Sequence, residues 1–171
     1  MARIHIPENV MLFVSMIFRD TQPLEDAKKD LKAIYGASCL ESKIVPFDYT
    51  AYYEREFGKE LSRQVMAFDK PVPRSSLADI KTRTNQIEDK LSQGSKRMVN
   101  LDPGLLSYEN ICLATTKPYS HRIYIDNGIW AEITLMYSKD SYRAIAWTYP
   151  DYGSQEMITL FNHLRKIYKG S

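Results

Sequence analysis

Residues 10–18 read Val-Met-Leu-Phe-Val-Ser-Met-Ile-Phe, a run with one polar side chain. A strand with both faces covered shows this pattern, whereas a strand with one face in water alternates apolar and polar residues. The run is too short to cross a membrane, which needs about 20 residues. Arg3 is the one basic residue before it, and no small-residue cleavage site follows, so we expect no signal peptide. The run therefore predicts a buried first strand.

Two amphipathic helices are predicted in the first hundred residues. The first begins near Asp20 and ends at Gly36, and Leu24, Ala27, Leu31 and Ile34 share one of its faces. The second begins at Ser76 and ends at Gly94, with Asp79 as a capping-box partner of Ser76. Its apolar stripe consists of Leu77, Ile80, Thr84, Ile87 and Leu91.

Three further strands and a short helix complete this half of the chain. Strands are predicted over residues 43–47, 61–69 and 97–101, and the short helix over residues 50–57. Asp102-Pro103-Gly104 is expected to end the last strand in a turn. The resulting order β-α-β-β-α-β is the ferredoxin-like pattern, an antiparallel sheet with two helices on one face.

The second half adds strands over residues 111–116, 122–125, 129–137 and 143–149. A final helix follows Ser154, with Met157, Phe161, Leu164 and Tyr168 facing inward. No linker-like composition separates the halves, so we expect one α+β domain over residues 1–171. Its ferredoxin-like first half is extended by further antiparallel strands and a C-terminal helix.

Composition narrows the range of partners. The 171 residues include 23 basic and 21 acidic side chains, a formal net charge of +2. This balance gives no long-range field of the kind that dominates nucleic-acid binding, so nucleic acid is not an expected partner. Cys39 and Cys112 are isolated and are expected to be buried thiols, which suits a cytoplasmic location. We expect no membrane partner.

The segment 121–135 predicts a hairpin with its turn at Asp126-Asn127-Gly128. A two-residue loop would leave each face a mixture of apolar and polar residues. A three-residue loop places Ile125 opposite Ile129 and puts the apolar residues on one face, which are Ile123, Ile125, Ile129, Ala131, Ile133 and Leu135. Because burial of one face sets strand register, we favour the three-residue loop.

The favoured register predicts two cross-strand pairs, Arg122 with Glu132 and Tyr124 with Trp130. One interpretation of their face is a solvated surface, where an ion pair contributes about 0–1 kcal/mol. The other is a ligand-binding floor, because an arginine among aromatic rings suits a planar or phosphate-bearing ligand. The sequence leaves both open.

Four groups of residues resemble a bacterial family known as the domain of unknown function 4416. They are Asn-Leu-Asp-Pro-Gly at 100–104, Ala-Thr-Thr-Lys at 114–117 with Ser-His-Arg-Ile-Tyr at 120–124, Gly-Ile-Trp-Ala-Glu-Ile-Thr-Leu at 128–135, and Trp-Thr-Tyr-Pro-Asp-Tyr at 147–152. Some members are labelled as GTP-binding. This sequence has neither GxxxxGK[ST] nor an NKxD-type segment, so a conventional GTPase is disfavoured and a nucleotide bound in another way stays open.

Several polar side chains fall at the ends of the predicted strands, where sites form on a rigid scaffold. Asp102 could bind Mg²⁺ or accept a proton, or could belong to an ordinary turn. Thr116 and Lys117 could hold an oxyanion, or could be solvated. His121 is expected at the end of the apolar face beside Ile133, in a structural or acid–base role. Asp151 could belong to a site or merely precede the last helix.

We therefore expect a protein that binds, and could act on, a small phosphorylated or nucleotide-like ligand in a strand-end pocket. The expected ligand-binding residues are Asn100, Thr116, Lys117, Arg122, Tyr124, Trp130 and Tyr149. The candidate catalytic residues are Asp102, His121, Glu132 and Asp151. Mg²⁺ is a possible cofactor, held by Asp102 and Asp151, and no zinc, haem or NAD signature is present.

The rival hypothesis is a non-enzymatic module for protein interaction or homodimer formation. Six of the twelve tyrosines lie between residues 119 and 152. A sheet face rich in tyrosine and tryptophan would suit a protein contact as well as a small ligand.

Overall fold

The computed structural model describes residues 3–50, 53 and 57–170. The strands in these residues are β1 (Met11–Phe18), β2 (Ser38–Glu41), β3 (Val45–Pro46), β4 (Ser62–Phe68), β5 (Val99–Leu106), β6 (Asn110–Thr115), β7 (Ile123–Asp126), β8 (Ile129–Ser138) and β9 (Ser141–Ala144). The helices are α1 (Thr21–Tyr35), α3 (Leu77–Leu91), α4 (Gln155–Gly170) and the short 3₁₀ helix η2 (Arg74–Ser76).

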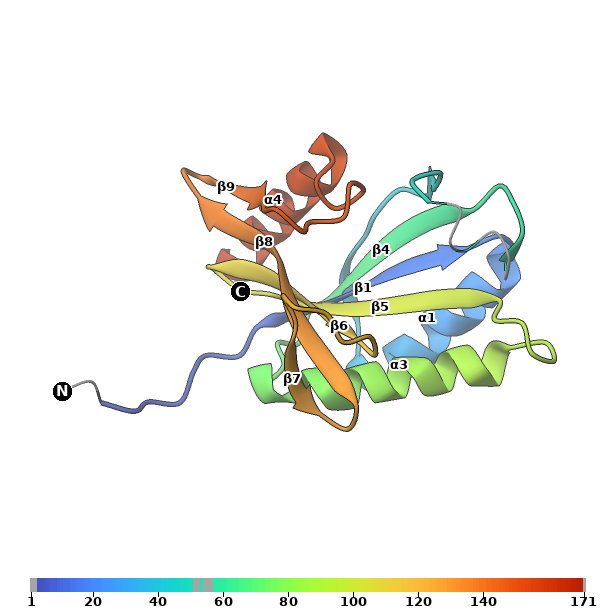
Figure 1. Ribbon diagram of the computed structural model, residues 1–171, viewed down its shortest axis with the longest axis horizontal. Coiled ribbons are helices and arrows are strands. Elements are labelled where there is room, and N and C mark those ends of the chain that lie inside the picture. Colours follow the sequence, from blue (N-terminus) through green and yellow to red (C-terminus); the bar gives the residue numbers. More distant parts are fainter. Residues whose placement is uncertain (1–2, 51–52, 54–56, 171) are drawn as a thin grey trace.

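All strand pairings in the described residues are antiparallel, and they form one large sheet. Its order is β2-β4-β1-β5-β6-β8-β7, with β3 paired to β4 and β9 paired to β8. Helices α1 and α3 lie together along one side, and α4 lies apart from them near β9 (Figure 1). The predicted α+β class and the C-terminal helix are thereby confirmed.

Strand β1 lies inside the sheet between β4 and β5, and all eight of its residues are buried. Leu12, Val14 and Met16 belong to the core shared with α1 and α3. Phe13, on the opposite face, packs against Phe161 of α4 with ring centroids 4.9 Å apart. Because apolar elements cover both faces, the strand is apolar at nearly every position.

The expected turn at Asp102-Pro103-Gly104 is wrong, because all three residues lie inside β5. Gly104 faces Phe13 across the β1–β5 pair. A Cβ atom there would lie 2.7 Å from Cε1 of Phe13 and 2.8 Å from Cδ2 of Leu113. The glycine therefore permits close packing inside the sheet and does not form a turn.

Strands β5 and β6 pair only between Gly104–Leu106 and residues 111–113. Before Gly104, the backbone of Leu101 is bonded by side chains of α3: its N–H donates to Glu88 Oε1 (2.5 Å), and its carbonyl accepts from Lys81 Nζ (2.9 Å). Pro103 has no N–H to donate on this same edge. The two strands therefore diverge, and polar groups of α3 occupy the gap between them.

Other predicted elements differ in detail. The strand predicted over residues 43–47 is reduced to β3, and the longer strand is β2. The predicted strand over residues 143–149 ends early, at Ala144. The helix predicted over residues 50–57 falls largely outside the described residues. The strand predicted over residues 97–101 runs on to Leu106 in β5. The remaining predicted strands are present with small shifts of their ends.

The two helix starts have different outcomes. Ser76 makes no capping bond and donates instead to the Pro73 carbonyl (2.6 Å), so the predicted capping box is absent. Ser154 Oγ accepts from the N–H of Met157 (3.3 Å), as a cap should.

Both cysteines are half-buried free thiols, so the expectation of full burial is wrong. Among the described residues, no helix has both the length and the apolar character to span a membrane.

Candidate functional site

The β7–β8 hairpin combines features of both predicted registers. Asp126 pairs with Ile129 across a two-residue loop in which Asn127 (φ 51°) and Gly128 (φ 76°) both have positive φ. A bulge at Ile125 then shifts the register, so that Tyr124 pairs with Trp130. The expected Ile125–Ile129 pair is therefore wrong, whereas the expected Tyr124–Trp130 pair is present.

The apolar face predicted for this hairpin does not form as a unit. Ile123 is 72% exposed and Ile133 is 39% exposed, whereas Ile129 is buried in the core shared with α3. A second bulge, at Thr134, moves Leu135 to the opposite face and into the core shared with α4. A bulge reverses the alternation of side chains between the two faces of a strand. The apolar–polar pattern of the sequence gives no sign of this bulge.

The opposite face holds a buried charge cluster around Glu132, which we call the Glu132 cluster. Arg122 Nε donates to Glu132 Oε2 (2.7 Å), and the two side chains are 2% and 3% exposed. His121 Nε2 lies 2.9 Å from the same oxygen. The ring of His121 stacks on Trp147, with centroids 5.3 Å apart. Its expected place beside Ile133 is therefore wrong, because it faces the carboxylate.

The guanidinium of Arg122 is bonded at all three nitrogens. Besides Glu132, it donates to the carbonyl of Lys117 (2.8 Å) and to the hydroxyl of Tyr149 (2.8 Å), and it lies 4.6 Å from the ring centre of Tyr119. Burial alone would lower the pKa of Arg122, but the bond to Glu132 raises it above its ordinary value. Arg122 therefore links β7 and β8 to the loops that contain Lys117 and Tyr149, and its guanidinium is permanently charged.

A second buried pair joins β4 to the segment before α4. Arg63 Nη2 donates to Asp151 Oδ2, and the side chains are 4% and 9% exposed. The guanidinium lies between two rings, 4.9 Å from that of Phe47 and 5.1 Å from that of Tyr152. Arg63 Nε has no hydrogen-bond partner in the part of the chain that the structure describes. Burial raises the pKa of Tyr152 above its usual range.

A third polar group fills the gap between β5 and β6. Asn100 accepts from Arg97 (2.9 Å) and donates to Asp102 Oδ2 (2.6 Å). Lys81 approaches the other oxygen of Asp102 at 3.5 Å, and Arg97 also bonds Glu88 (3.1 Å). Burial raises the pKa of Glu88 above its ordinary value, although the charge of Lys81 opposes this. The Asp102 side chain is 29% exposed, much more than Glu132 or Asp151.

These three groups line one cavity of about 710 Å³. Eight of the eleven predicted site residues lie in its wall, namely Asn100, Asp102, Thr116, Lys117, Arg122, Glu132, Tyr149 and Asp151. His121, Tyr124 and Trp130 do not line it. The structure therefore brings most of the candidates together, and their roles stay predictions.

Sequence reasoning missed several residues that line the cavity, among them Arg63, Lys81, Glu88, Arg97 and Tyr152. Lys81 and Glu88 each follow a stripe residue of the predicted helix and are seven positions apart, so they lie on one helix face. Two charged residues beside the apolar stripe of the helix were the sequence feature that could have pointed to Lys81 and Glu88. Arg63, Arg97 and Tyr152 gave no comparable signal.

The charges in the cavity wall are balanced. Five basic and five acidic side chains line it within the described residues. No group of three or more His, Cys, Asp or Glu residues in that part of the chain could hold a metal ion. Asp151 is already paired with Arg63, so Asp102 is the better placed of the two suggested Mg²⁺ ligands.

Comparison with known proteins gives one match. No curated protein and no solved structure shows significant similarity to the chain. The model of one family, described as a domain of unknown function (DUF4416), matches residues 8–168, which include the sheet strands and nearly all of α4. The chain therefore belongs to the family of the domain of unknown function DUF4416.

Proposed function

We propose that this protein binds a small phosphorylated or nucleotide-like ligand in the cavity of about 710 Å³. The observation that carries the proposal is the joint lining of this space by basic, carboxylate and tyrosine side chains from distant parts of the chain. Sites for small ligands commonly measure about 300–1,000 Å³ and contain a few convergent polar groups. The cavity has that size, and its wall is more strongly charged than is common, with five basic and five acidic side chains among the described residues.

The anionic part of the ligand is best placed near Lys117 and Arg97. Lys117 is exposed and Arg97 is half-buried, so both can reach a ligand that enters from solvent. Arg63, Lys81 and Arg122 are buried against their carboxylate partners. Arg97 also bonds Glu88, but 27% of its side chain stays exposed. We therefore assign Arg122 a positioning role: it fixes the wall that carries Lys117 and Tyr149.

The planar part of the ligand is best placed against the tyrosines of the wall. Tyr119 and Tyr149 line the cavity and are exposed at its edge. Tyrosine offers a flat apolar face together with a polar tip. Tyr124 and Trp130, expected to stack on the ligand, pack against each other at 73° outside the cavity wall. The stacking role accordingly moves to Tyr119 and Tyr149.

Asp102 is the carboxylate best placed to contact the ligand. It is the most accessible of the candidate catalytic carboxylates, and Asn100 and Lys81 hold it from two sides. Such a group could accept a proton or bind Mg²⁺ together with phosphate oxygens, since Mg²⁺ is often held by one or two carboxylates and the substrate phosphates.

A thermal-shift screen tests the proposal with AMP, GMP and glucose 6-phosphate, each with and without Mg²⁺. We expect at least one probe to raise the melting temperature, since binding to the native state stabilises it. Lys117→Ala should abolish the shift, whereas Lys166→Ala, an exposed site on α4 outside the cavity, should leave it unchanged. Absence of a shift with every probe would overturn the proposal.

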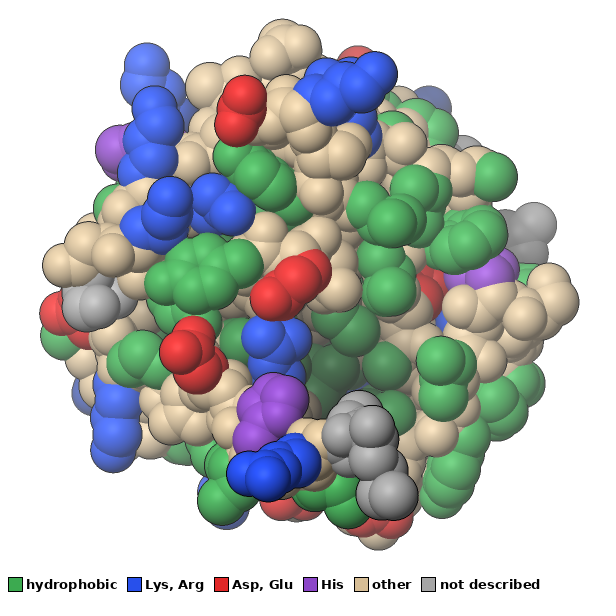
Figure 2. All heavy atoms as spheres, turned by 90° about the vertical axis from the view of Figure 1, so that its left-hand side faces the viewer, with side chains coloured by type: hydrophobic (Ala, Val, Ile, Leu, Met, Phe, Trp, Pro, Cys, Tyr) green, Lys and Arg blue, Asp and Glu red, His purple; other side chains and the backbone are tan. Residues whose placement is uncertain are grey.

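The rival function, formation of a homodimer, is supported by a different surface. Strand β7 is an edge of the sheet, and Ile123 (72%), Tyr124 (54%) and Met136 (50%) are exposed on β7 and β8. Figure 2 shows the end of the molecule at the left of Figure 1, where hydrophobic side chains lie inside a hollow and along its right side, and charged side chains border its left. An exposed edge strand can pair with the same strand of a second copy.

Light scattering after size-exclusion chromatography distinguishes this rival. A dimer that becomes a monomer in Ile123→Glu, while Lys139→Glu stays dimeric, would support pairing through β7. A wild-type monomer at high protein concentration would exclude it.

We also infer that the first half of the chain follows the ferredoxin-like path. The order β2-β4-β1-β5 with antiparallel neighbours supports this inference, as do helices α1 and α3 packed in one core. An experimental structure that places α1 and α3 on opposite faces of the sheet would contradict it.

A further inference from the structure

A second cavity, of about 350 Å³, lies between α4 and the strands β2, β3 and β4. We call it the apolar cavity, and we call the cavity of about 710 Å³ the polar cavity. Its apolar lining includes Leu40, Val45, Phe47, Val65, Met157 and Leu160. A lining of this kind favours an apolar group over water. The space is large enough for part of a small molecule.

The two cavities meet at Phe47 and Arg63, because both side chains line both spaces. Arg63 is held on one side by Asp151 and lies between the Phe47 and Tyr152 rings, which leaves Nε without a hydrogen-bond partner among the described residues. A buried donor without an acceptor destabilises a fold unless another group satisfies it. A ligand with an acceptor oxygen at this junction would do so.

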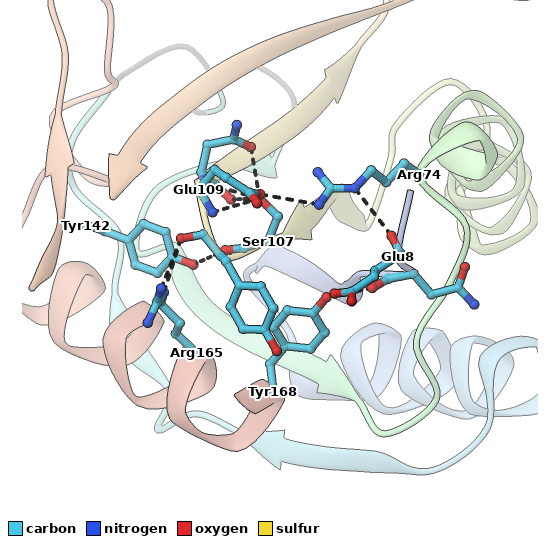
Figure 3. Close-up of polar contacts among 10 residues, drawn as sticks. Glu8, Arg74, Ser107, Glu109, Tyr142, Arg165 and Tyr168 are labelled. Carbon is cyan, nitrogen blue, oxygen red and sulfur yellow. Dashed lines mark hydrogen bonds and ion pairs between the residues drawn. The ribbon is translucent and has the colours of Figure 1, made fainter. Parts of the chain in front are cut away.

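Helix α4 forms one wall of the apolar cavity, and its C-terminal part is bonded to the rest of the fold (Figure 3). Tyr168 donates to the carbonyl of Asn9 (2.6 Å), and Arg165 Nη2 donates to that of Tyr108 (3.2 Å). Phe161 and Leu164 on the same helix are fully buried. The cavity therefore lies beside a firmly packed helix and is not the gap left by a loosely docked one.

We propose that the ligand is an amphiphile, a phosphorylated head group joined to an acyl chain through an ester or amide. The head occupies the polar cavity, the linking carbonyl accepts from Arg63 Nε, and the chain fills the apolar cavity. This inference rests on the proposed function of the polar cavity. Polar residues such as Glu41, Ser42 and His163 also line this space, but its surface is mainly apolar. A nucleobase would place several polar edge atoms against that apolar surface, whereas an acyl chain brings none.

Isothermal titration with glycerol 3-phosphate and its acetyl, butyryl, hexanoyl and octanoyl esters tests the inference. We expect affinity to rise roughly three- to four-fold for each methylene until the apolar cavity is full. An alkyl ether of the same length lacks the carbonyl and should bind roughly ten-fold more weakly than the ester.

One variant separates the two cavities. Thr159 is an exposed α4 residue in the apolar wall, so Thr159→Trp should fill that space and remove the chain-length dependence. The variant should still bind glycerol 3-phosphate like the wild type. Lys166→Trp, on the same helix but outside both cavities, should behave as wild type towards every probe.

The outcomes distinguish this inference from the proposed function. If glycerol 3-phosphate binds and its esters bind no more tightly, the acyl-chain proposal is overturned while binding in the polar cavity stands. If chain-length dependence survives in Thr159→Trp, the chain binds elsewhere and the proposal is also overturned. If no probe binds and the nucleotide screen is also silent, the function proposed for the polar cavity fails as well.

Discussion

Replacement of Glu132 by alanine should destabilise the protein far more than replacement of its neighbour Ile133. Glu132→Ala leaves the buried guanidinium of Arg122 without its carboxylate and removes the partner of His121. Removal of one member of a buried ion pair costs about 3–5 kcal/mol. Arg122 keeps its bonds to the Lys117 carbonyl and to Tyr149, so we expect a loss near the lower limit, about 3 kcal/mol.

The contrast with Ile133 makes the experiment decisive. That side chain is 39% exposed and already reaches water, so Ile133→Ala should cost about 1 kcal/mol. For a chain of this length, about 3 kcal/mol corresponds to a fall in melting temperature of about 6–12 °C. Urea denaturation followed by circular dichroism measures both variants.

The double variant Arg122→Met/Glu132→Leu should recover part of the loss, because no charge is then left buried and unpaired. If Ile133→Ala proves more destabilising than Glu132→Ala, the assignment of the two faces of β8 is wrong. A periodic reading of the sequence, which places Ile133 in the core, predicts that opposite result.

Three further predictions concern the remainder of the fold. Gly104→Ala should lower the free energy of unfolding, measured by urea denaturation, by about 2–3 kcal/mol, because its Cβ would overlap Phe13. Gly170 has open space around it, so Gly170→Ala should change that free energy by less than about 0.5 kcal/mol. Tyr142→Phe should cost about 1–2 kcal/mol, because the buried hydroxyl donates to the Ser107 carbonyl (2.5 Å) and the acceptor would lose its partner. Although burial opposes the effect, bonds to two lysines lower the pKa of Glu41 from 4.5 to about 2. This stabilisation, about 2 kcal/mol after screening, should be present above pH 4.5 and lost as the pH falls towards 2, and stability in Glu41→Gln should lack that part of the pH dependence.

The elements with strong periodicity were predictable from the sequence. The unbroken apolar run of β1 and the apolar stripes of α3 and α4 are confirmed, because burial of a continuous face depends on residue spacing alone. The Asp102-Pro103-Gly104 segment was not predictable in the same way. Pro103 lies where β5 diverges from β6, and Gly104 permits the close approach of Phe13. Both features depend on tertiary packing and not on local turn propensity.

The candidate site was predictable in part for the same reason. Lys117 follows the end of β6 and reaches the cavity as expected of a strand-end residue. Asp151 also reaches it, but from the segment before α4, because β9 ends at Ala144. The hairpin was harder, since the bulges at Ile125 and Thr134 change which residues face the core and leave no trace in the alternation. Lys81 and Glu88 were missed because their burial depends on the gap beside Leu101.

Nuclear magnetic resonance can establish whether the polar cavity binds a phosphate-bearing ligand. The ¹H–¹⁵N spectrum would be recorded while AMP or glycerol 3-phosphate is added to saturation. We expect saturable shifts concentrated at cavity residues such as Asn100, Asp102 and Lys117, and their loss in Lys117→Ala. An unchanged spectrum with both ligands, or saturable shifts confined to residues outside the cavity, would contradict it.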